Sequence, residues 1–412
     1  MPPASRLQRR TLRVLGAAQV FGGIGFFLGV TVAALLARDV SGEEALGGVP
    51  LAFGIATAAL AAAPLATWMA RAGRRPGLAA GHVIAAAGAA VVVGAAALES
   101  FPILCLGMAA FGLGNTSNLL ARYAATDLAE PQQRARAISV VLLATAAGAI
   151  AGPNLASSTE PLADALGLLD SAGPFVVAVA AHVLAAAILL ILLRPDPLLA
   201  SRGENRDETA RPVVGWTSEL RGLPSWPRLA IIGVAAMAAS NVAMVGVMTM
   251  TPIHMEDAGE SLSAVGLVIS LHVAGMYLPS PISGWLADRL GRLPVLAGGG
   301  LALVLAGALA AIAPGDHVPL MALALALLGI GWNMGLVGGS ALVTEAVAVE
   351  RRPQVQGAAD LVMGLTGVSG NLVAGPLFQA GAFAVLGGGA AAIGCLLIAL
   401  ASRGSGTPAP AR

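Results

Sequence analysis

Two short stretches of the chain repeat one another. Residues 284–294 are GWLADRLGRLP and residues 66–76 are ATWMARAGRRP. At a constant offset of 218 residues they share Arg, Gly, Arg and Pro, at Arg71, Gly73, Arg74 and Pro76 in the first stretch and at Arg289, Gly291, Arg292 and Pro294 in the second. Asp127 meets Glu345 at the same offset. An internal repeat of this length predicts two structurally equivalent halves.

The composition is that of a protein that lies in lipid. Hydrophobic residues make up 57% of the 412 residues and charged residues only 11%, whereas a soluble domain is about 25% charged. A soluble protein this apolar would expose hydrophobic surface and aggregate. The composition therefore excludes a soluble enzyme, a nucleic-acid-binding protein and a disordered chain, and predicts an integral membrane protein.

Twelve apolar segments can each cross a bilayer, which takes about 20 residues. They cover roughly residues 13–37, 46–69, 77–98, 102–124, 135–157, 172–193, 228–253, 262–287, 293–313, 318–344, 354–380 and 382–402. The predicted fold is an all-α membrane protein with twelve transmembrane helices in two six-helix, pseudo-symmetric halves. We expect an N-terminal half at 1–193, a polar cytoplasmic linker at 194–227 and a C-terminal half at 228–412.

The basic residues predict the orientation. All 23 are Arg, and with these spans only Arg38 lies on the opposite side from the others. Because Arg-rich loops stay in the cytoplasm, we expect both termini to be cytoplasmic, with residues 1–13 a tail and not a cleaved signal peptide. Half of the 22 acidic residues fall on the outer face. That face could attract cations, although ordinary topological bias explains the same pattern.

Several residues inside spans have no partner that the sequence identifies. Cys105 and Cys395 fall in separate spans, so no disulfide framework is implied. His82 and His182 lie in the third and sixth spans, where a satisfied interior histidine and a proton carrier both remain open. No carboxylate lies near the middle of a span, so uniport and coupling through protonation of His272 both stay open.

The second copy of the repeat resembles the loop signature of the major facilitator superfamily. Gly284, Asp288, Arg289, Gly291 and Arg292 match the pattern found between helices 8 and 9 of that superfamily. The first copy is degraded, with Ala66 and Ala70 where Gly and Asp are expected. The resemblance implies a transporter and leaves its substrate open.

The same loop predicts a gating latch formed by Asp288, Arg289 and Arg292. We expect Asp288 to accept hydrogen bonds at the positive N-terminus of a neighbouring helix. We expect the two Arg residues to pair with acids such as Asp127 or Glu130. Simple anchoring of Arg at the lipid interface is the alternative.

Soft metal ligands gather in the seventh and eighth spans. Met244 and Met248 are four residues apart, as are His272 and Met276, so each pair lies on one helix face. Two adjacent antiparallel helices would place Met244 and His272 at similar depth near the middle of the membrane. The four donors would spread over about 12 Å, which predicts a two- or three-ligand site or a hand-over from Met248 towards Met276.

The ligand types favour copper. Thioether and imidazole donors suit Cu(I), whereas Mg, Ca and Mn require oxygen ligands. Methionine is also an ordinary filler of apolar interiors, but a histidine inside a span is a functional candidate by default. At the outer end of the seventh span, His254, Met255, Glu256 and Asp257 are candidates for capturing the ion. A polar loop at the interface is the alternative.

The two motifs resemble those of the CcoA-type copper importers within the superfamily, which carry MxxxM in helix 7 and HxxxM in helix 8. The resemblance implies that copper, as Cu(I) or Cu(II), is imported across the cytoplasmic (inner) membrane for cytochrome oxidase assembly. It implies a ligand role for Met244, Met248, His272 and Met276 only. A cytoplasmic copper chaperone is the expected acceptor.

The predicted function is therefore copper import by alternating access, in a monomer with no permanent cofactor and no nucleic-acid partner. The alternative is a carrier of a small organic solute such as a flavin or drug, although five Trp and two Tyr give no signal of an aromatic-lined cavity. A copper sensor on a transporter scaffold is a third reading.

Overall fold

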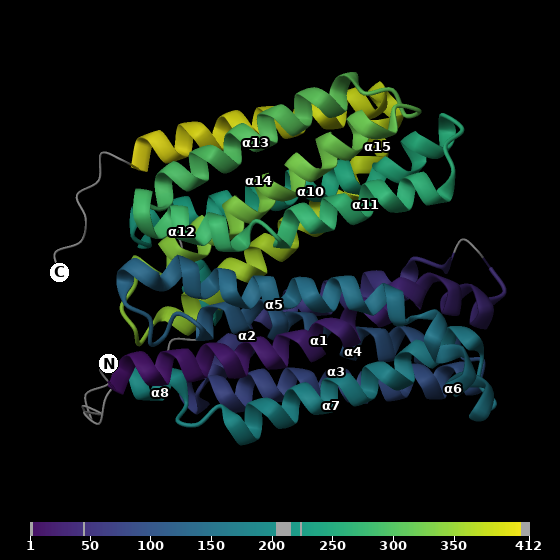
Figure 1. Ribbon diagram of the computed structural model, residues 1–412, viewed down its shortest axis with the longest axis horizontal. Helices are drawn as coiled ribbons and strands as arrows, with labels where there is room; N and C mark the ends of the chain where they lie inside the picture. The colour runs from purple at the N-terminus through teal and green to yellow at the C-terminus, as the bar shows by residue number, and fades with distance from the viewer. Residues whose placement is uncertain (1–2, 44–45, 203–215, 223–224, 405–412) are drawn as a thin grey trace. The chain divides into compact units, whose positions relative to one another are not determined.

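The computed structural model describes residues 3–43, 46–202, 216–222 and 225–404, and all its regular elements there are helical. Twelve helical stretches in this part of the chain are long and apolar enough to cross a membrane (Figure 1). The predicted all-α fold with twelve spans is confirmed.

Ten long helices, one of which carries two spans, and one pair of shorter helices make these spans. The first six spans lie in α1 (Pro3–Ser41), α2 (Val49–Ala72), α3 (Arg74–Ala97), α4 (Phe101–Ala124), α5 (Arg134–Leu155) and α7 (Gly173–Leu192). The others lie in α10 (Arg228–Asp257), α11 (Leu262–Tyr277) with α12 (Ser280–Leu290), α13 (Arg292–Ile312), α14 (Val318–Glu345) and α15 (Arg352–Gly404), which carries two. Short connecting helices are η2 (Pro131–Gln133), η3 (Ser157–Thr159), α6 (Glu160–Ala165), η4 (Asp170–Ala172), α8 (Pro197–Ser201) and α9 (Trp216–Arg221).

Three predicted spans differ in detail from the helices observed. The predicted span 262–287 is interrupted between α11 and α12 at Leu278 and Pro279. Proline lacks the backbone N–H that an uninterrupted helix would need. The last two predicted spans form the single element α15, because residues 380–383 are Ala-Gly-Ala-Phe and no polar loop separates them. Residues 203–215 and 223–224 of the predicted linker lie outside the described residues.

The repeated glycines form equivalent tight turns. Gly73 lies between α2 and α3 with φ of 99°, and Gly291 lies between α12 and α13 with φ of 103°. Side chains with a Cβ rarely adopt this region, so glycine is the residue that permits each turn. In both turns an arginine then begins the next helix.

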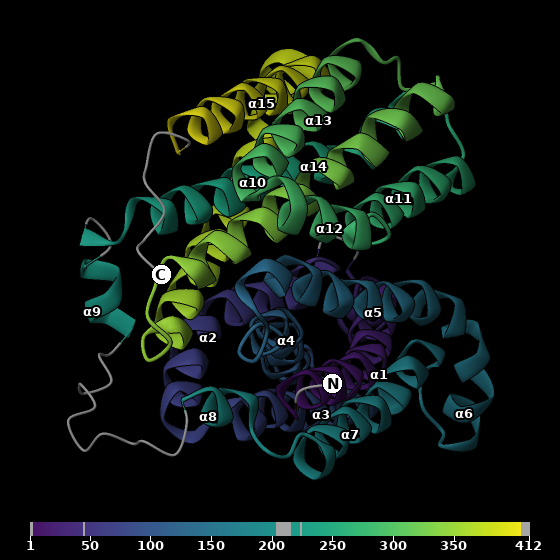
Figure 2. The ribbon, with the colours of Figure 1, turned by 60° about the vertical axis from the view of Figure 1, so that its left-hand side comes forward.

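The chain forms two compact units whose borders cross the predicted halves. Unit 1 comprises Met1–Ala129, Ala144–Glu219 and Val349–Leu361, and unit 2 comprises Glu130–Leu143, Leu220–Ala348 and Val362–Arg412. The first turns of α5 thus belong to unit 2, and those of α15 belong to unit 1. These segments correspond to one another at the repeat offset. Figure 2 shows unit 1 nearly end-on, with α4 packed among α1, α2 and α3.

A buried ion pair fixes one end of unit 1. The guanidinium of Arg74 donates to both carboxylate oxygens of Asp127, at 2.9 and 3.3 Å, and to Gln356 Oε1 at 2.6 Å. Both charged side chains are fully buried. Burial raises the pKa of the Asp127 carboxyl, and the adjacent Arg74 guanidinium opposes that rise. The pair therefore ties the turn at Gly73 to the residues that follow α4.

Unit 2 contains the equivalent pair in a more exposed setting. Arg292 donates to Glu345 at 2.5 Å and lies 3.3 Å from Asp288. The side chains of Arg292 and Glu345 are 11% and 26% exposed. Unlike Arg74, Arg292 has two carboxylate neighbours, so removing one leaves it a second.

Unit 1 contains a further buried ion pair, which has no counterpart at the repeat offset. Arg122 in α4 and Asp360 in α15 are bound through both guanidinium nitrogens, and Tyr123 donates its hydroxyl to the same carboxylate at 3.1 Å. The equivalent positions in the other half are Ser340 and Leu142. This pair distinguishes unit 1 from unit 2.

The two repeated pairs predict different sensitivities to neutralisation. We expect Asp127→Asn to lower the free energy of unfolding by about 3–5 kcal/mol, because it leaves the buried Arg74 without a counter-charge. Glu345→Gln should cost less, since Arg292 is partly hydrated and retains Asp288. Thermal unfolding of the purified variants in detergent measures the difference, and equal losses would contradict it.

Candidate functional site

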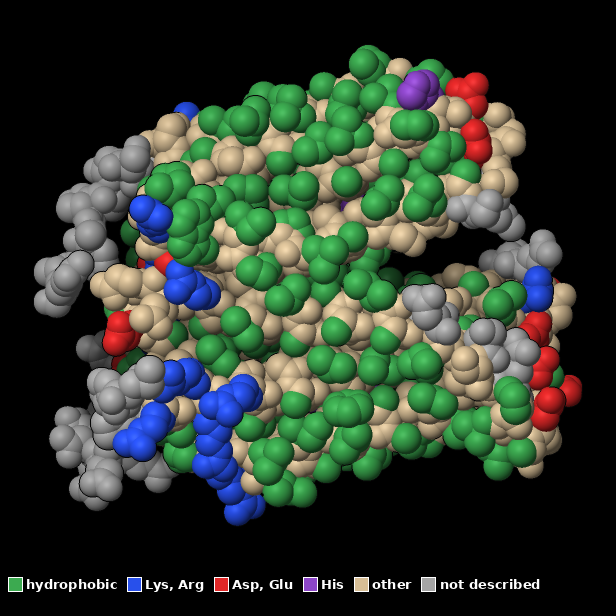
Figure 3. Space-filling model, viewed as in Figure 1, with side chains coloured by type: hydrophobic (Ala, Val, Ile, Leu, Met, Phe, Trp, Pro, Cys, Tyr) green, Lys and Arg blue, Asp and Glu red, His purple; other side chains and the backbone are tan. Residues whose placement is uncertain are grey.

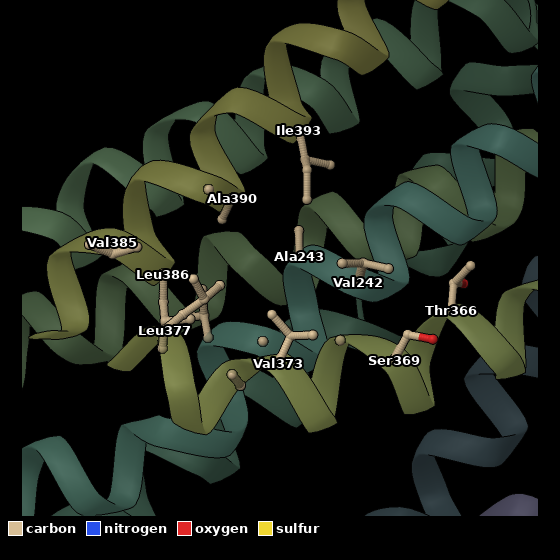
Figure 4. A pocket seen from close by; sticks show the side chains of 15 residues that line it. Val242, Ala243, Thr366, Ser369, Val373, Leu377, Val385, Leu386, Ala390 and Ile393 are labelled. Atoms are coloured by element: carbon tan, nitrogen blue, oxygen red, sulfur yellow. The ribbon is translucent and has the colours of Figure 1, made fainter. Parts of the chain in front are cut away.

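A cavity in unit 2 lies between α10 and the two spans of α15. These spans are called here its first arm (Arg352–Ala380) and its second arm (Phe383–Arg403). The cavity has a volume of about 280 Å³. Figure 4 shows Val242 and Ala243 of α10 facing Val373 and Leu377 of the first arm, with Ala390 on the second arm. Its walls are aliphatic side chains and glycines, and aromatic residues are absent from the described lining. This agrees with the lack of an aromatic signal in the sequence.

Two hydroxyls provide the polar atoms on side chains of the cavity lining. Thr366 donates to the carbonyl of Met363 at 2.9 Å, and Ser369 donates to that of Leu365 at 3.0 Å. Each hydroxyl proton is therefore used within α15, while the oxygen lone pairs can still accept a hydrogen bond. The cavity can hold an apolar body and accept a few hydrogen bonds from it. The sequence contains no motif that predicts this lining.

His272, one of the predicted copper ligands, packs on α14. Its ring is fully buried and its Nδ1 lies 2.9 Å from the carbonyl oxygen of Leu325. Because a carbonyl only accepts, Nδ1 carries the proton and Nε2 presents a lone pair. Nε2 has no hydrogen-bond partner among the described residues. A neutral imidazole oriented in this way can act as a ligand or as a hydrogen-bond acceptor.

The methionines of the predicted site are not among the residues that line the cavity. Met244 is buried and Met248 is half-buried, and the 3.6-residue period places both on the opposite face of α10 from Val242 and Gly246. On that face α10 packs on α14, where Met237 accepts from Ser340 and Asn241 accepts from Trp332. Met276 is buried, and its carbonyl accepts from Asn333.

The two helices that carry the predicted copper ligands share one main packing partner. Both α10 and α11 pack extensively along α14, and they contact each other little. In the described residues, no group of three or more His, Cys, Asp or Glu side chains could hold a metal ion. The arrangement therefore leaves the methionine sulfurs and the His272 imidazole on two helices that both pack on α14.

The predicted outer-capture residues point in different directions. His254 lies 3.1 Å from the carbonyl of Ala313 and stacks on Phe383 with ring centroids 4.4 Å apart. Met255 is fully buried, whereas Asp257 is exposed. The side chain of Glu256 lies outside the described part of the chain. His254 and Met255 thus contribute to helix packing at this end of unit 2.

Each of the three predicted latch residues makes a contact within unit 2. The Asp288 carboxylate accepts hydrogen bonds from the backbone N–H groups of Ala135 and Arg136, at 3.1 and 3.0 Å. These two residues lie at the N-terminus of α5. Arg292 pairs with Glu345 and not, as expected, with Asp127 or Glu130, because α13 packs along α14, which ends at Glu345. Asp127 is bound to Arg74. The guanidinium of Arg289 lies over the Trp285 ring at 5.1 Å.

Other polar residues of the spans hold helices together. Asn241 accepts from Trp332 at 3.0 Å and donates to the carbonyl of Met363 at 3.0 Å, so it links α10, α14 and α15. Asn333 donates to Ser280 at 2.7 Å. Cys105 is buried in α4, Cys395 is exposed on α15, and both are free.

Comparison with known proteins places this architecture in a family. A model of the Major Facilitator Superfamily matches residues 15–370 and 246–412. YddS of Bacillus subtilis, an uncharacterised transporter of the MFS type, is 41% identical over 96% of this chain and 90% of its own length. The riboflavin transporter RfnT of Brucella anthropi is 32% identical over 90% of this chain and 89% of its own length.

Solved structures agree in fold. The transporter FucP in its outward conformation superposes with a TM-score of 0.76 at 16% identity, over 96% of this chain and 99% of its own. A bacterial homologue of the iron transporter ferroportin gives 0.75 at 16% identity, over 96% of this chain and all of its own. At such identities the likeness concerns the fold alone. Together with the family match and the twelve spans, it leads to one conclusion: the chain belongs to the major facilitator superfamily and is a secondary transporter, not an enzyme.

Proposed function

We propose that this transporter carries a small organic solute of the flavin class by alternating access. The observation that carries the proposal is the 32% identity to a riboflavin transporter along 89% of that protein. This alternative from the sequence has better support than copper, because neither YddS nor RfnT is named for a metal.

The cavity of unit 2 matches part of the chemistry of a flavin ring. Its aliphatic wall suits the flat methylated face of the ring, and the Thr366 and Ser369 oxygens can accept from an imide N–H or a sugar-like hydroxyl. At about 280 Å³ it lies just below the roughly 300–1,000 Å³ typical of small-molecule sites. That size favours a free vitamin over a dinucleotide.

Copper import is a second candidate because of His272. The lone pair on its Nε2 is buried and has no partner among the described residues, as a neutral metal ligand would be before loading. Met244 and Met276 are buried on helices that pack on the same neighbour as His272. Supply of copper to a chaperone and to cytochrome oxidase assembly remains a prediction from resemblance.

The proposed orientation keeps both termini in the cytoplasm. Figure 3 shows that, on the visible face of each unit, most Arg side chains lie at one end, together with some acidic side chains, while the other end carries mainly Asp and Glu side chains. In the positive-inside rule the Arg-rich end is cytoplasmic. Loading from the acidic outer end and release at the Arg-rich end would then be import across the inner membrane.

Filling the cavity should block uptake of the solute. We expect cells that make the parent protein to accumulate external riboflavin and cells with Ala243→Trp to accumulate at least about tenfold less, since an indole would occupy the space of the ring. Leu396→Phe is the matched control, because Leu396 is 52% exposed on α15 outside the lining. Both variants must reach the membrane in equal amounts. Unchanged uptake by Ala243→Trp would remove the cavity from the pathway.

The copper candidate has a separate test. If the transporter carries an organic solute, His272→Ala and Met244→Ala should leave cellular copper content and ⁶⁴Cu uptake unchanged from the parent. Loss of ⁶⁴Cu uptake in both variants, with normal amounts of protein in the membrane, would favour copper and identify those side chains as ligands. Exposed Leu267→Ala on α11 serves as the control.

A further inference from the structure

Two histidines that are 100 residues apart in the sequence meet inside unit 1. Nδ1 of His82 in α3 lies 3.2 Å from Nδ1 of His182 in α7. The ring centroids are 5.4 Å apart with an interplanar angle of 30°. Their side chains are almost completely buried in the middle of two membrane-spanning helices. Two aliphatic side chains could pack at this depth without burying a polar group. An ionisable residue there is therefore a functional candidate.

Glycines on two neighbouring helices make room for the rings. A Cβ on Gly22 of α1 would lie 2.6 Å from Cε1 of His82, and one on Gly114 of α4 would lie 2.7 Å from Cε1 of His182. A Cβ on Gly25 would be 3.1 Å from Nε2 of His182. The bundle is therefore built around two imidazoles, and small residues face the edges that carry Nε2.

Polar atoms without partners surround the pair. Nε2 of His182 and both amide atoms of Asn118 are buried with no hydrogen-bond partner among the described residues. Gln19 continues the polar region, since it donates to the carbonyl of Asn118 at 3.2 Å and to Thr145 Oγ1 at 2.7 Å. Unsatisfied buried groups of this kind are costly unless water or a ligand occupies the site.

We propose that His82 and His182 form a proton-binding site that couples transport to a proton gradient. In the neutral pair, one Nδ1–H donates to the other Nδ1, so the donor ring has a bare Nε2 and the acceptor ring carries its proton on Nε2. One proton from water adds to the bare Nε2. The product is one imidazolium bonded to one neutral imidazole, and release to water on the other side of the membrane restores the neutral pair.

The residues that we find next to the two rings are uncharged. Residues found beside the rings are Gly22 and Gly25 on α1, Gly114, Phe111 and Asn118 on α4, and Ala85 and Ala181 on α3 and α7. None of these is titratable. Arg122, one turn beyond Asn118 on α4, is bound to Asp360. A bound proton would thus be stabilised by hydrogen bonds, such as one to the Asn118 oxygen, and by water, without help from a carboxylate.

The site concerns the driving force and does not rest on the flavin proposal. The predicted spans carry no carboxylate near their middle, and the histidine pair provides an ionisable group at that depth. A purely structural pair would hold its hydrogen bond and never exchange a net proton.

Nitrogen NMR distinguishes the two cases without a transported solute. The whole chain, labelled with ¹⁵N-histidine and held in lipid nanodiscs, is titrated between about pH 8 and about pH 5, where histidines change charge in proteins. We expect two coupled imidazole signals that together take up one proton. His82→Gln and His182→Gln should each remove one signal and change the titration of the other. His317→Asn, which alters an exposed-loop residue at the start of α14, should leave both signals unchanged.

Each result decides the proposal. A variant counts as folded when the His272 signal is retained. Two rings that remain neutral throughout, or that titrate independently, would overturn the proton site. In proteoliposomes with riboflavin as the probe, His182→Gln should retain exchange at equal concentrations and lose accumulation driven by a pH gradient. Absence of any riboflavin exchange in the parent would count against the flavin proposal alone, and the NMR result would still stand.

Discussion

An arginine that follows a left-handed glycine, and is paired with a carboxylate near the end of a neighbouring helix, organises each half of this protein. Arg74 with Asp127 and Arg292 with Glu345 occupy equivalent positions in the two halves. In an apolar bundle such a charge is tolerated only with a partner and hydrogen bonds. Each pair therefore fixes the turn between two spans relative to a carboxylate 53 residues later in the chain, at or just beyond the end of α4 or α14.

The candidate functional features lie where the two halves differ. The Arg122–Asp360 pair and the two meeting histidines belong to unit 1, and the cavity and His272 belong to unit 2. The repeat thus supplies a scaffold of equivalent spans, while unit 1 carries a histidine pair and an extra ion pair in its interior and unit 2 carries an apolar space and the single buried His272. This division is compatible with a carrier in which the driving ion and the solute bind to different units.

The sequence predicts what depends on local pattern. Hydropathy gives the spans, and the repeat predicts the equivalent turns at Gly73 and Gly291. The helix dipole predicts that Asp288 binds a helix N-terminus, which the structure shows at α5. Contacts between residues that are far apart in the sequence cannot be predicted from local pattern. The pairs Arg292–Glu345 and His82–His182 join different helices, so they depend on how those helices pack. The cavity is made of ordinary aliphatic residues at helix contacts, so no motif marks it.

Equilibrium binding of riboflavin to the purified transporter tests the assignment most directly. Quenching of flavin fluorescence should saturate at one site per chain, and Ala243→Trp should abolish it while His272→Ala should not. The contrary result would be the absence of saturable flavin binding together with Cu(I) binding that disappears in His272→Ala. That outcome would transfer the substrate site from the apolar cavity to the buried imidazole and sulfurs around α14.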